Sequence, residues 1–210
     1  MPKSKLIKQI IYLKNTDLKR IVDFKLKQFR KLRFADNKTI FKELCFCLLT
    51  ANFNAARAVK IQNTLQDEFL TLSENNLARR LKELGHRFPN MRAKYIVEAR
   101  KHISVLQDVL KTKINEQELR NWFVKNVKGL GLKEASHFLR NIGFNNFAIV
   151  DFHIVDLLVR ENLLEKPKSI TKKTYLFVEN ILKKLGEEVD LNLAELDLYL
   201  WYIETNTVIK

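Results

Sequence analysis

The sequence predicts an all-α protein, and three observations support this fold class. The 210 residues include only five glycines and three prolines, so few positions interrupt a helix. Apolar side chains recur at helical spacing, and no stretch shows the apolar-polar alternation of a strand. A hydrophobic content of 46% is enough to build a core for one large domain or two small domains.

The first half of the chain reads as a series of helices separated by short breaks. Thr16 is a candidate N-cap for the first helix, and Asp36 or Asn37 is a candidate N-cap for the second. We expect helices over residues 16–33, 40–49, 55–68, 73–84, 91–110 and 116–125.

The next break contains two glycines and is the most informative stretch. Gly129 and Gly131 allow a tight turn and a close approach of the backbone to another molecule. Apolar side chains at helical spacing then predict a helix from Leu132, with Gly143 at its C-terminal stop. The amides of both glycines should therefore lie just before a helix N-terminus, where N–H groups and the helix dipole attract a phosphate.

Lys133 falls in the first turn of this helix, where the dipole disfavours a cation and favours the neutral, nucleophilic amine. A lone lysine beside a hairpin is more often an ordinary solvated side chain. Further along, Asp151 is a good N-cap for a helix that continues to about Leu163. Two more helices are expected, one from Thr171 to Gly186 and a last one capped by Asn192.

The pattern Gly-apolar-Gly-x-Lys-x-Ala, followed by Val-Asp-x-His-apolar, resembles the helix-hairpin-helix DNA glycosylases that are also AP lyases. This superfamily contains endonuclease III and the 8-oxoguanine DNA glycosylases. The resemblance implies that Lys133 attacks C1′ of the damaged nucleotide and that Asp151 supports the positive charge developing on the sugar. The approach to the aspartate, residues 146–150, departs from the Gly/Pro-rich approach that is common in the superfamily.

Within the superfamily the chain is most similar to the compact second type of 8-oxoguanine DNA glycosylase/lyase of archaea and some bacteria. Residues 133–141 and 92–97 carry this similarity, together with a chain that ends nine residues after Trp201. The resemblance runs from about Asn37 to Lys210 and implies two helical subdomains with an active-site cleft between them. Residues 35–147 would form a six-helix bundle that includes the helix-hairpin-helix at about 116–142. Residues 1–34 would form an N-terminal helix that packs with the C-terminal helices of residues 148–210.

The resemblance also assigns residues that would hold the lesion. Phe88 and Trp201 would sandwich the oxidised guanine, and the chain end at Lys210 would contact the base. Asn52 would fill the gap left by the extruded base, and Arg57 would reach the opposite strand or a phosphate. From the residues alone, Trp201 also fits a helix core, Phe88 a loop plug, Asn52 a helix end and Arg57 a surface charge.

Charge and composition narrow the class of partner. A formal net charge of +14 suits a polyanion, because basic side chains that neutralise phosphates release counterions. A generally lysine-rich composition would give the same charge. No stretch reaches the roughly twenty apolar residues that span a bilayer, and the N-terminus lacks a secretory apolar core. We therefore expect no membrane association and a cytoplasmic protein that acts on the chromosomal DNA of a prokaryote.

No cofactor is expected. Cys45 and Cys47 cannot supply the four thiolates of an iron–sulfur cluster, and both fit packing positions. His137 and His153 are expected to be structural, because no second metal ligand stands at a suitable spacing.

These observations together predict a monomeric enzyme that acts on double-stranded DNA containing 8-oxoguanine or abasic sites. Lys133 would release the base through a Schiff base, and β-elimination would then cleave the strand 3′ to the abasic site. Two alternatives remain open at this point. One is a glycosylase/lyase for another oxidised base, and the other is a non-catalytic helix-hairpin-helix module that only grips duplex phosphates.

Overall fold

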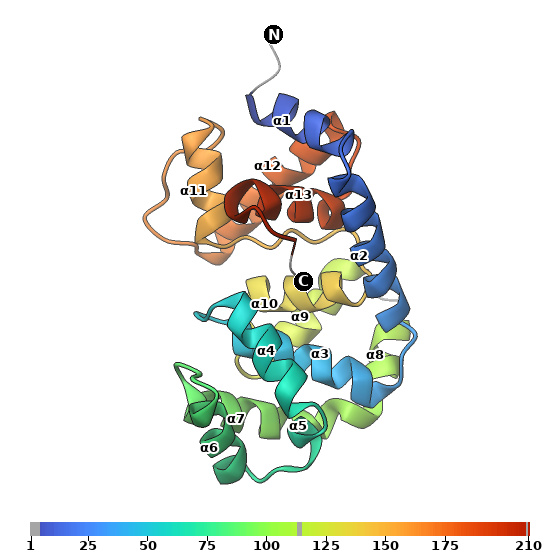
Figure 1. Ribbon diagram of the computed structural model, residues 1–210, viewed down its shortest axis with the longest axis vertical. Coiled ribbons are helices and arrows are strands. Elements are labelled where there is room, and N and C mark those ends of the chain that lie inside the picture. The colour runs from blue at the N-terminus through green and yellow to red at the C-terminus, as the bar shows by residue number, and fades with distance from the viewer. Residues whose placement is uncertain (1–4, 113–114, 209) are drawn as a thin grey trace. The chain divides into compact units, whose positions relative to one another are not determined.

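The computed structural model describes residues 5–112, 115–208 and 210 (Figure 1). Within these ranges the chain forms α-helices and a 3-10 helix and contains no strand, so the all-α prediction is confirmed. The chain divides into two compact units. One consists of Met1–Lys31 with Leu139–Lys210, and the other is the continuous stretch Leu32–Phe138. The subdomain limits expected from the resemblance, after residues 34 and 147, remain predictions.

The unit built from both chain ends contains helices α1, α2, α11, α12 and α13. Helix α2 buries one stripe of side chains, Leu18, Val22, Leu26 and Phe29, against Ala194, Leu198 and Tyr199 of α13. The spacing of this stripe matches the helical period, which explains why a helix rich in lysine and arginine has an apolar face. The bounds are α1 Lys5–Lys14, α2 Leu18–Leu32, α11 Phe152–Arg160, α12 Lys172–Glu188 and α13 Leu193–Thr205.

The continuous unit is organised around helix α3, which spans Asn37–Thr50 and is buried on nearly all sides from Ile40 onward. A helix that is apolar all round belongs inside a core, and several other helices of this unit pack against it. The bounds are α4 Ala55–Leu65, α5 Glu68–Thr71, α6 Glu74–Glu83, α7 Pro89–Ala99, the 3-10 helix η1 Arg100–Val105, α8 Leu106–Lys111, α9 Glu116–Asn126 and α10 Leu132–Asn141, of which the part from Leu139 onward belongs to the other unit.

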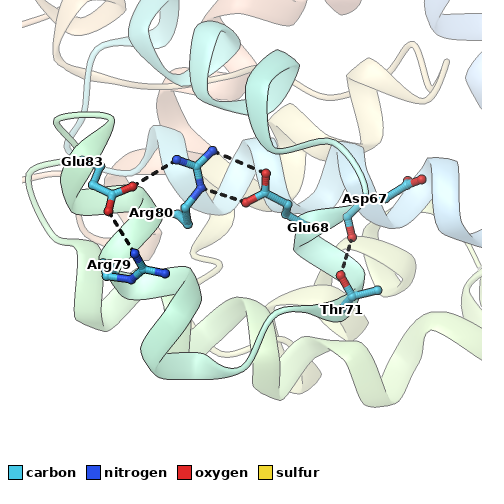
Figure 2. Close-up of polar contacts among 6 residues, drawn as sticks. All are labelled: Asp67, Glu68, Thr71, Arg79, Arg80 and Glu83. Atoms are coloured by element: carbon cyan, nitrogen blue, oxygen red, sulfur yellow. Dashed lines mark hydrogen bonds and ion pairs between the residues drawn. The ribbon is translucent and has the colours of Figure 1, made fainter.

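An ion-pair network connects α6 with α5 (Figure 2). The guanidinium of Arg80 binds both carboxylate oxygens of Glu68, at 3.0 Å through Nε and 3.4 Å through Nη2. Its remaining nitrogen, Nη1, reaches Glu83 at 3.0 Å, and Arg79 binds the other oxygen of Glu83 at 3.4 Å. These two carboxylates raise the pKa of Arg80 above its ordinary value. The network orients α6, and α6 leads into the loop that carries Phe88.

Several predicted helix limits were wrong, and backbone geometry explains why. The predicted helix 55–68 ends at Leu65, because Gln66 takes a left-handed φ of 42°, and α5 follows as a separate turn. The predicted helix 91–110 is divided into α7, η1 and α8. The stretch 35–147 is therefore split into more helices than the six that were expected.

The other differences lie near the two chain ends. Helix α1 was not predicted at all, whereas Thr16 stands just before α2 as expected and its hydroxyl accepts from the amide of Leu18 at 3.3 Å. The helix that begins after Asp151 ends at Arg160, close to Asn162 with a φ of 56°. Helix α12 continues through Gly186 to Glu188. Gly186 therefore does not end the helix, and a glycine fits there because a Cβ would be 2.6 Å from the carbonyl oxygen of Leu191.

No helix in the described ranges is both long enough and apolar enough to cross a membrane.

Candidate active site

The glycine hairpin joins α9 to α10 and has little room for side chains. Gly129 has a φ of +92°, and a Cβ at this position would lie 2.3 Å from Cδ2 of Tyr95 on α7. Only glycine adopts this positive φ without strain and also leaves the tyrosine ring in place. The turn is closed by a hydrogen bond of 3.2 Å from the amide of Leu130 to the carbonyl of Val127. The backbone therefore turns tightly against α7 before the next helix begins.

Glu134 completes the start of α10. Its carboxylate accepts the amide of Gly131 at 3.2 Å, and the carbonyl of Gly131 accepts the amide of Ala135 at 3.0 Å. An acidic side chain in the first helical turn is favoured by the helix dipole. The amide of Gly131, which was expected to meet a phosphate, thus has an internal partner in this structure. A phosphate could bind there only by replacing Glu134.

Lys133 lies in the first turn of α10 and is half-buried. Within the described residues of its own unit, its amine has no hydrogen-bond or ion-pair partner. The buried face of the helix is formed instead by Ala135 and Phe138. A lysine in this position adds nothing to helix stability, because a cation near a helix N-terminus is disfavoured. Its unengaged amine is the kind of group that covalent catalysis requires.

In the other unit, Asp151 is the N-cap of α11, as predicted. Its Oδ1 accepts the amide of Ile154 at 3.1 Å, which fixes the direction of the half-buried carboxylate. The segment that leads to it is held by α12. The hydroxyl of Tyr175 donates to the carbonyl of Ala148 at 2.6 Å and accepts the amide of Val150 at 3.3 Å. The carboxylate of Glu179 accepts the amide of Ala148 at 3.2 Å.

This arrangement explains how the chain reaches Asp151 without the glycines and prolines that are common in the superfamily. The side chains of Tyr175 and Glu179 form hydrogen bonds with the backbone of residues 148–150 and fix its path. Conformational restriction by proline is therefore not needed. Neither residue was singled out by the sequence. Both lie on the buried face of α12, and nothing in the sequence pattern of that helix shows which loop they contact.

The two base-pocket candidates on helices are each accompanied by other side chains of their own unit. Phe88 is half-buried at the N-terminus of α7, with the guanidinium of Arg87 4.9 Å from its ring centre and that of Arg92 6.0 Å away. Trp201 is half-buried on α13 and meets the ring of His153 edge-on at 5.8 Å. Among the described residues, its indole N–H is buried without a hydrogen-bond partner.

The remaining predicted residues are exposed or lie at the chain end. Asn52 is exposed in the turn between α3 and α4 with a φ of 55°, a conformation that asparagine tolerates after a helix. Arg57 is exposed in the first turn of α4. Lys210 is half-buried. The helix-end reading of Asn52 is therefore correct for its backbone, while its side chain points outward and is available for contact.

Within the continuous unit, a chain of contacts connects Phe88 with the hairpin. Arg92 on α7 lies between the rings of Phe88 and Tyr95, with its guanidinium 5.9 Å from the Tyr95 ring centre, and Tyr95 packs on Gly129. Arg92 is buried, and this burial lowers the pKa of its guanidinium. Arg92 and Tyr95 belong to the segment 92–97 that supported the resemblance, although no role was assigned to either.

Four residues, His137, His153, Cys45 and Cys47, were expected to be structural, and three of them are buried as that expectation requires. His137 is buried edge-on against Phe46 at 5.5 Å. Cys45 and Cys47 are buried in α3, and burial raises the pKa of the Cys45 thiol well above its ordinary value. His153 differs, because it is exposed beside Trp201. In the described part of the chain, no group of three His, Cys, Asp or Glu side chains is placed to hold a metal ion.

Two helices joined by a Gly-x-Gly hairpin, with a lysine in the first turn of the second, define a helix-hairpin-helix protein built to meet DNA phosphates. The model of the 8-oxoguanine DNA glycosylase family, the Ogg-HhH family, matches residues 22–191, and the chain belongs to this family. The resemblance inferred from the motifs is therefore confirmed.

Relatives match along nearly the whole chain. The 8-oxoguanine DNA glycosylase/AP lyase of Korarchaeum cryptofilum is 50% identical over 98% of this chain and 98% of its own length. The crystal structure of the Methanocaldococcus jannaschii 8-oxoguanine glycosylase/lyase in complex with a 15mer DNA containing 8-oxoguanine has a TM-score of 0.94 and 47% identity, over 98% of this chain and 99% of that one. The 8-oxoguanine DNA glycosylase of Thermotoga maritima gives a TM-score of 0.92 at 38% identity, over 98% and 99%.

Proposed function

We propose that this chain is a bifunctional repair enzyme that excises 8-oxoguanine from duplex DNA and cleaves the strand at the resulting abasic site. The observation that carries this proposal is the unengaged amine of Lys133 at the exit of the hairpin. Relatives that are 50% and 47% identical along nearly their whole length are named 8-oxoguanine DNA glycosylase/AP lyase. A DNA-binding module without catalysis would leave that amine without a role and would leave Asp151 with its N-cap role alone.

In the proposed first step the neutral amine of Lys133 attacks C1′ of the damaged nucleotide. The N-glycosidic bond breaks, its electron pair leaves with the base, and a proton completes the freed base. Asp151 stabilises the positive charge on the sugar and helps to orient the amine. The sugar ring then opens to a Schiff base between Lys133 and C1′.

The second step uses the same covalent linkage. Loss of a proton from C2′ sends electrons toward the iminium, and the bond to the 3′ phosphate breaks by β-elimination. Water then hydrolyses the Schiff base and restores the lysine. Every step draws on protein side chains and water, so we propose that no metal or organic cofactor takes part.

The other candidate residues receive roles in substrate binding. We propose that Phe88 and Trp201 stack on the two faces of the extruded base and that the chain end at Lys210 contacts its edge. The hairpin amides at Gly129 and Gly131 would bind the DNA backbone, the amide of Gly131 only after Glu134 has released it. Asn52 would fill the gap in the duplex, and Arg57 would contact a phosphate or the opposite strand. Because one chain supplies all of these residues, we propose that it acts as a monomer in the compartment that holds the chromosome.

A borohydride trapping assay tests the central claim. Reduction of the Schiff base should give a covalent adduct between the wild-type protein and a duplex that contains 8-oxoguanine, and Lys133→Gln should give none. Lys128→Gln is the matched control, because Lys128 lies on the same hairpin but is exposed and lies 3.7 Å from Glu98. An adduct with Lys133→Gln would refute the assignment. Duplexes with other oxidised bases, tested in parallel, would show whether 8-oxoguanine is the preferred lesion.

The role of the chain end is tested by extending it. A short tag after Lys210 should slow release of 8-oxoguanine, because the added residues would compete for the base pocket. Cleavage of a preformed abasic site should be much less affected, since no base has to be held there. Single-turnover rates on the two duplexes provide the measurement, and an N-terminal tag is the control. Equal rates for the tagged and untagged chain on both duplexes would show that Lys210 does not contact the base.

A further inference from the structure

His86 connects two parts of the continuous unit that are proposed to contact the damaged nucleotide. It stands at the end of α6, where a Schellman motif closes the helix. Gly85, with a φ of +75°, donates to the carbonyl of Lys82 at 2.9 Å, and the amide of His86 donates to that of Leu81 at 2.9 Å. This motif turns the histidine inward, so that only 4% of its surface is exposed.

Both ring nitrogens of His86 are engaged, and the partners determine the tautomer. The amide of Phe88 lies 3.1 Å from Nδ1, and an N–H can only donate, so Nδ1 is the unprotonated acceptor. Nε2 therefore carries the hydrogen and donates to the carbonyl of Leu49 at 3.0 Å. The ring of Phe53 stacks on the imidazole with 4.2 Å between centres. One neutral imidazole thus joins the Phe88 loop to the end of α3.

The end of α3 needs such a partner, because the last carbonyls of a helix have no partner within the helix. Leu49 and Ala51 are buried there, where an unpaired carbonyl is costly. His86 binds the carbonyl of Leu49, and Nη2 of Arg92 binds that of Ala51 at 2.6 Å. Asn52 follows immediately in its left-handed conformation. The direction of the Asn52 turn therefore depends on His86 and Arg92.

We propose that His86 is a positioning residue that sets Phe88 and Asn52 relative to one another. Its Nδ1 holds the backbone of Phe88, the stacking side chain, and its Nε2 holds the end of α3 just before Asn52, the gap-filling side chain. This inference rests on the proposed function, because it takes the roles of Phe88 and Asn52 from it. His86 itself does not touch the substrate.

The two nitrogens can be tested separately. His86→Gln places an amide donor near the position of Nε2 and loses the acceptor for the amide of Phe88. His86→Asn places an acceptor near the position of Nδ1 and loses the donor to Leu49. The matched control is His102→Gln, since the Nε2 of His102 also bonds a helix-end carbonyl, that of Asn126 at 2.9 Å, in the same unit. Circular dichroism confirms that each variant is folded.

Single-turnover rates are measured on a duplex with 8-oxoguanine and on one with a preformed abasic site. His86→Gln should slow base release roughly 10- to 100-fold, because small displacements of a positioning group have effects of this size. It should leave abasic cleavage close to the wild-type rate, since no base has to be stacked. His86→Asn should slow both reactions, because the gap must be filled in either duplex. His102→Gln should match the wild type on both.

Acidic pH should reproduce the Gln phenotype in the wild type. Burial lowers the pKa of His86 below its ordinary value, and the charge of Arg92, the ionisable group that faces it from α7, lowers it further, although the bond to Leu49 opposes the shift. When the ring is protonated, Nδ1 can no longer accept from Phe88. The ratio of base release to abasic cleavage should therefore fall only when the pH drops below the range in which an ordinary imidazole titrates. His86→Gln, which does not titrate, should lack this fall.

The outcomes are distinguishable. If the wild type releases no 8-oxoguanine, the proposed function fails and this inference fails with it. If the wild type is active and the two His86 variants have wild-type rates, or His86→Gln slows both reactions equally, the proposed function stands. In that case His86 is only a packing residue, and the inference is overturned.

Discussion

At the scale of single residues, two glycines of the continuous unit show the difference between conformational freedom and close packing. Gly129 and Gly85 both have positive φ values, +92° and +75°. A Cβ on Gly129 would collide with the ring of Tyr95, whereas a Cβ on Gly85 would have no heavy atom within 4 Å. Substitution at Gly85 therefore costs backbone strain alone, and substitution at Gly129 adds a steric clash at the hairpin.

We expect Gly129→Ala to lower the free energy of unfolding by roughly 2–5 kcal/mol, from left-handed strain and overpacking together. Gly85→Ala should cost about 1–2 kcal/mol, from the strain alone. Urea denaturation of the two variants and the wild type measures both quantities. A loss at Gly129 no larger than that at Gly85 would show that Tyr95 moves aside without cost.

At the scale of elements, two candidate site residues, Asp151 and Phe88, are placed by helices other than their own. Asp151 caps α11, but the backbone that leads to it is held by the side chains of Tyr175 and Glu179 on α12. Phe88 precedes α7 as its N-cap residue, but its amide is held by His86 just after the end of α6. In both cases a buried polar side chain satisfies the backbone of an irregular segment, as buried peptide groups require.

Tyr175→Phe should destabilise the protein by about 1–3 kcal/mol, because the buried carbonyl of Ala148 and amide of Val150 lose their partner. If the approach to Asp151 then shifts, the single-turnover rate on 8-oxoguanine should fall by about tenfold or more. Tyr12→Phe is the control. Its side chain is 70% exposed, so its stability should stay within about 0.5 kcal/mol. Wild-type stability and rate in Tyr175→Phe would show that these hydrogen bonds do not place the segment.

At the scale of the whole molecule, the net charge of +14 governs how the protein meets DNA. Each phosphate that is neutralised releases condensed counterions, so the logarithm of the affinity falls linearly with the logarithm of the salt concentration. With six to ten phosphate contacts, affinity for an undamaged duplex should fall roughly 10³- to 10⁵-fold between 50 and 200 mM salt. The slope counts the contacts and can be compared between variants.

Arg57→Ala should reduce this slope by about one if Arg57 contacts a phosphate. Arg79→Ala is the matched control, because Arg79 is an exposed arginine of the same unit whose guanidinium is paired with Glu83 at 3.4 Å. It should leave the slope unchanged. Fluorescence anisotropy with a labelled duplex at several salt concentrations measures both slopes. If Arg57→Ala has the same slope as the wild type, Arg57 does not contact a phosphate and is an ordinary surface charge.

The sequence by itself determined the features that depend on local pattern. These are the helical class, the N-caps at Asp151 and Asn192, the hairpin glycines, and the family, which follows from the spacing between Lys133 and Asp151. The choice between Asp36 and Asn37 as an N-cap was left open by the sequence, and the structure shows Asp36. Caps and hairpins are local because their hydrogen bonds join residues only a few positions apart. For the same reason, breaks caused by single left-handed residues such as Gln66 were missed, since no strong sequence signal marks them.

Only the tertiary structure showed what holds the candidate site in place. The partners of Ala148 on α12 lie 27 and 31 residues away in the chain, and Leu49 and His86 are 37 residues apart. It also showed that the amide of Gly131 is already bound by Glu134. Hydrophobic periodicity predicts which face of a helix is buried but not which loop that face meets. That choice is made by the packing of the helices, which brings distant polar groups within hydrogen-bonding distance.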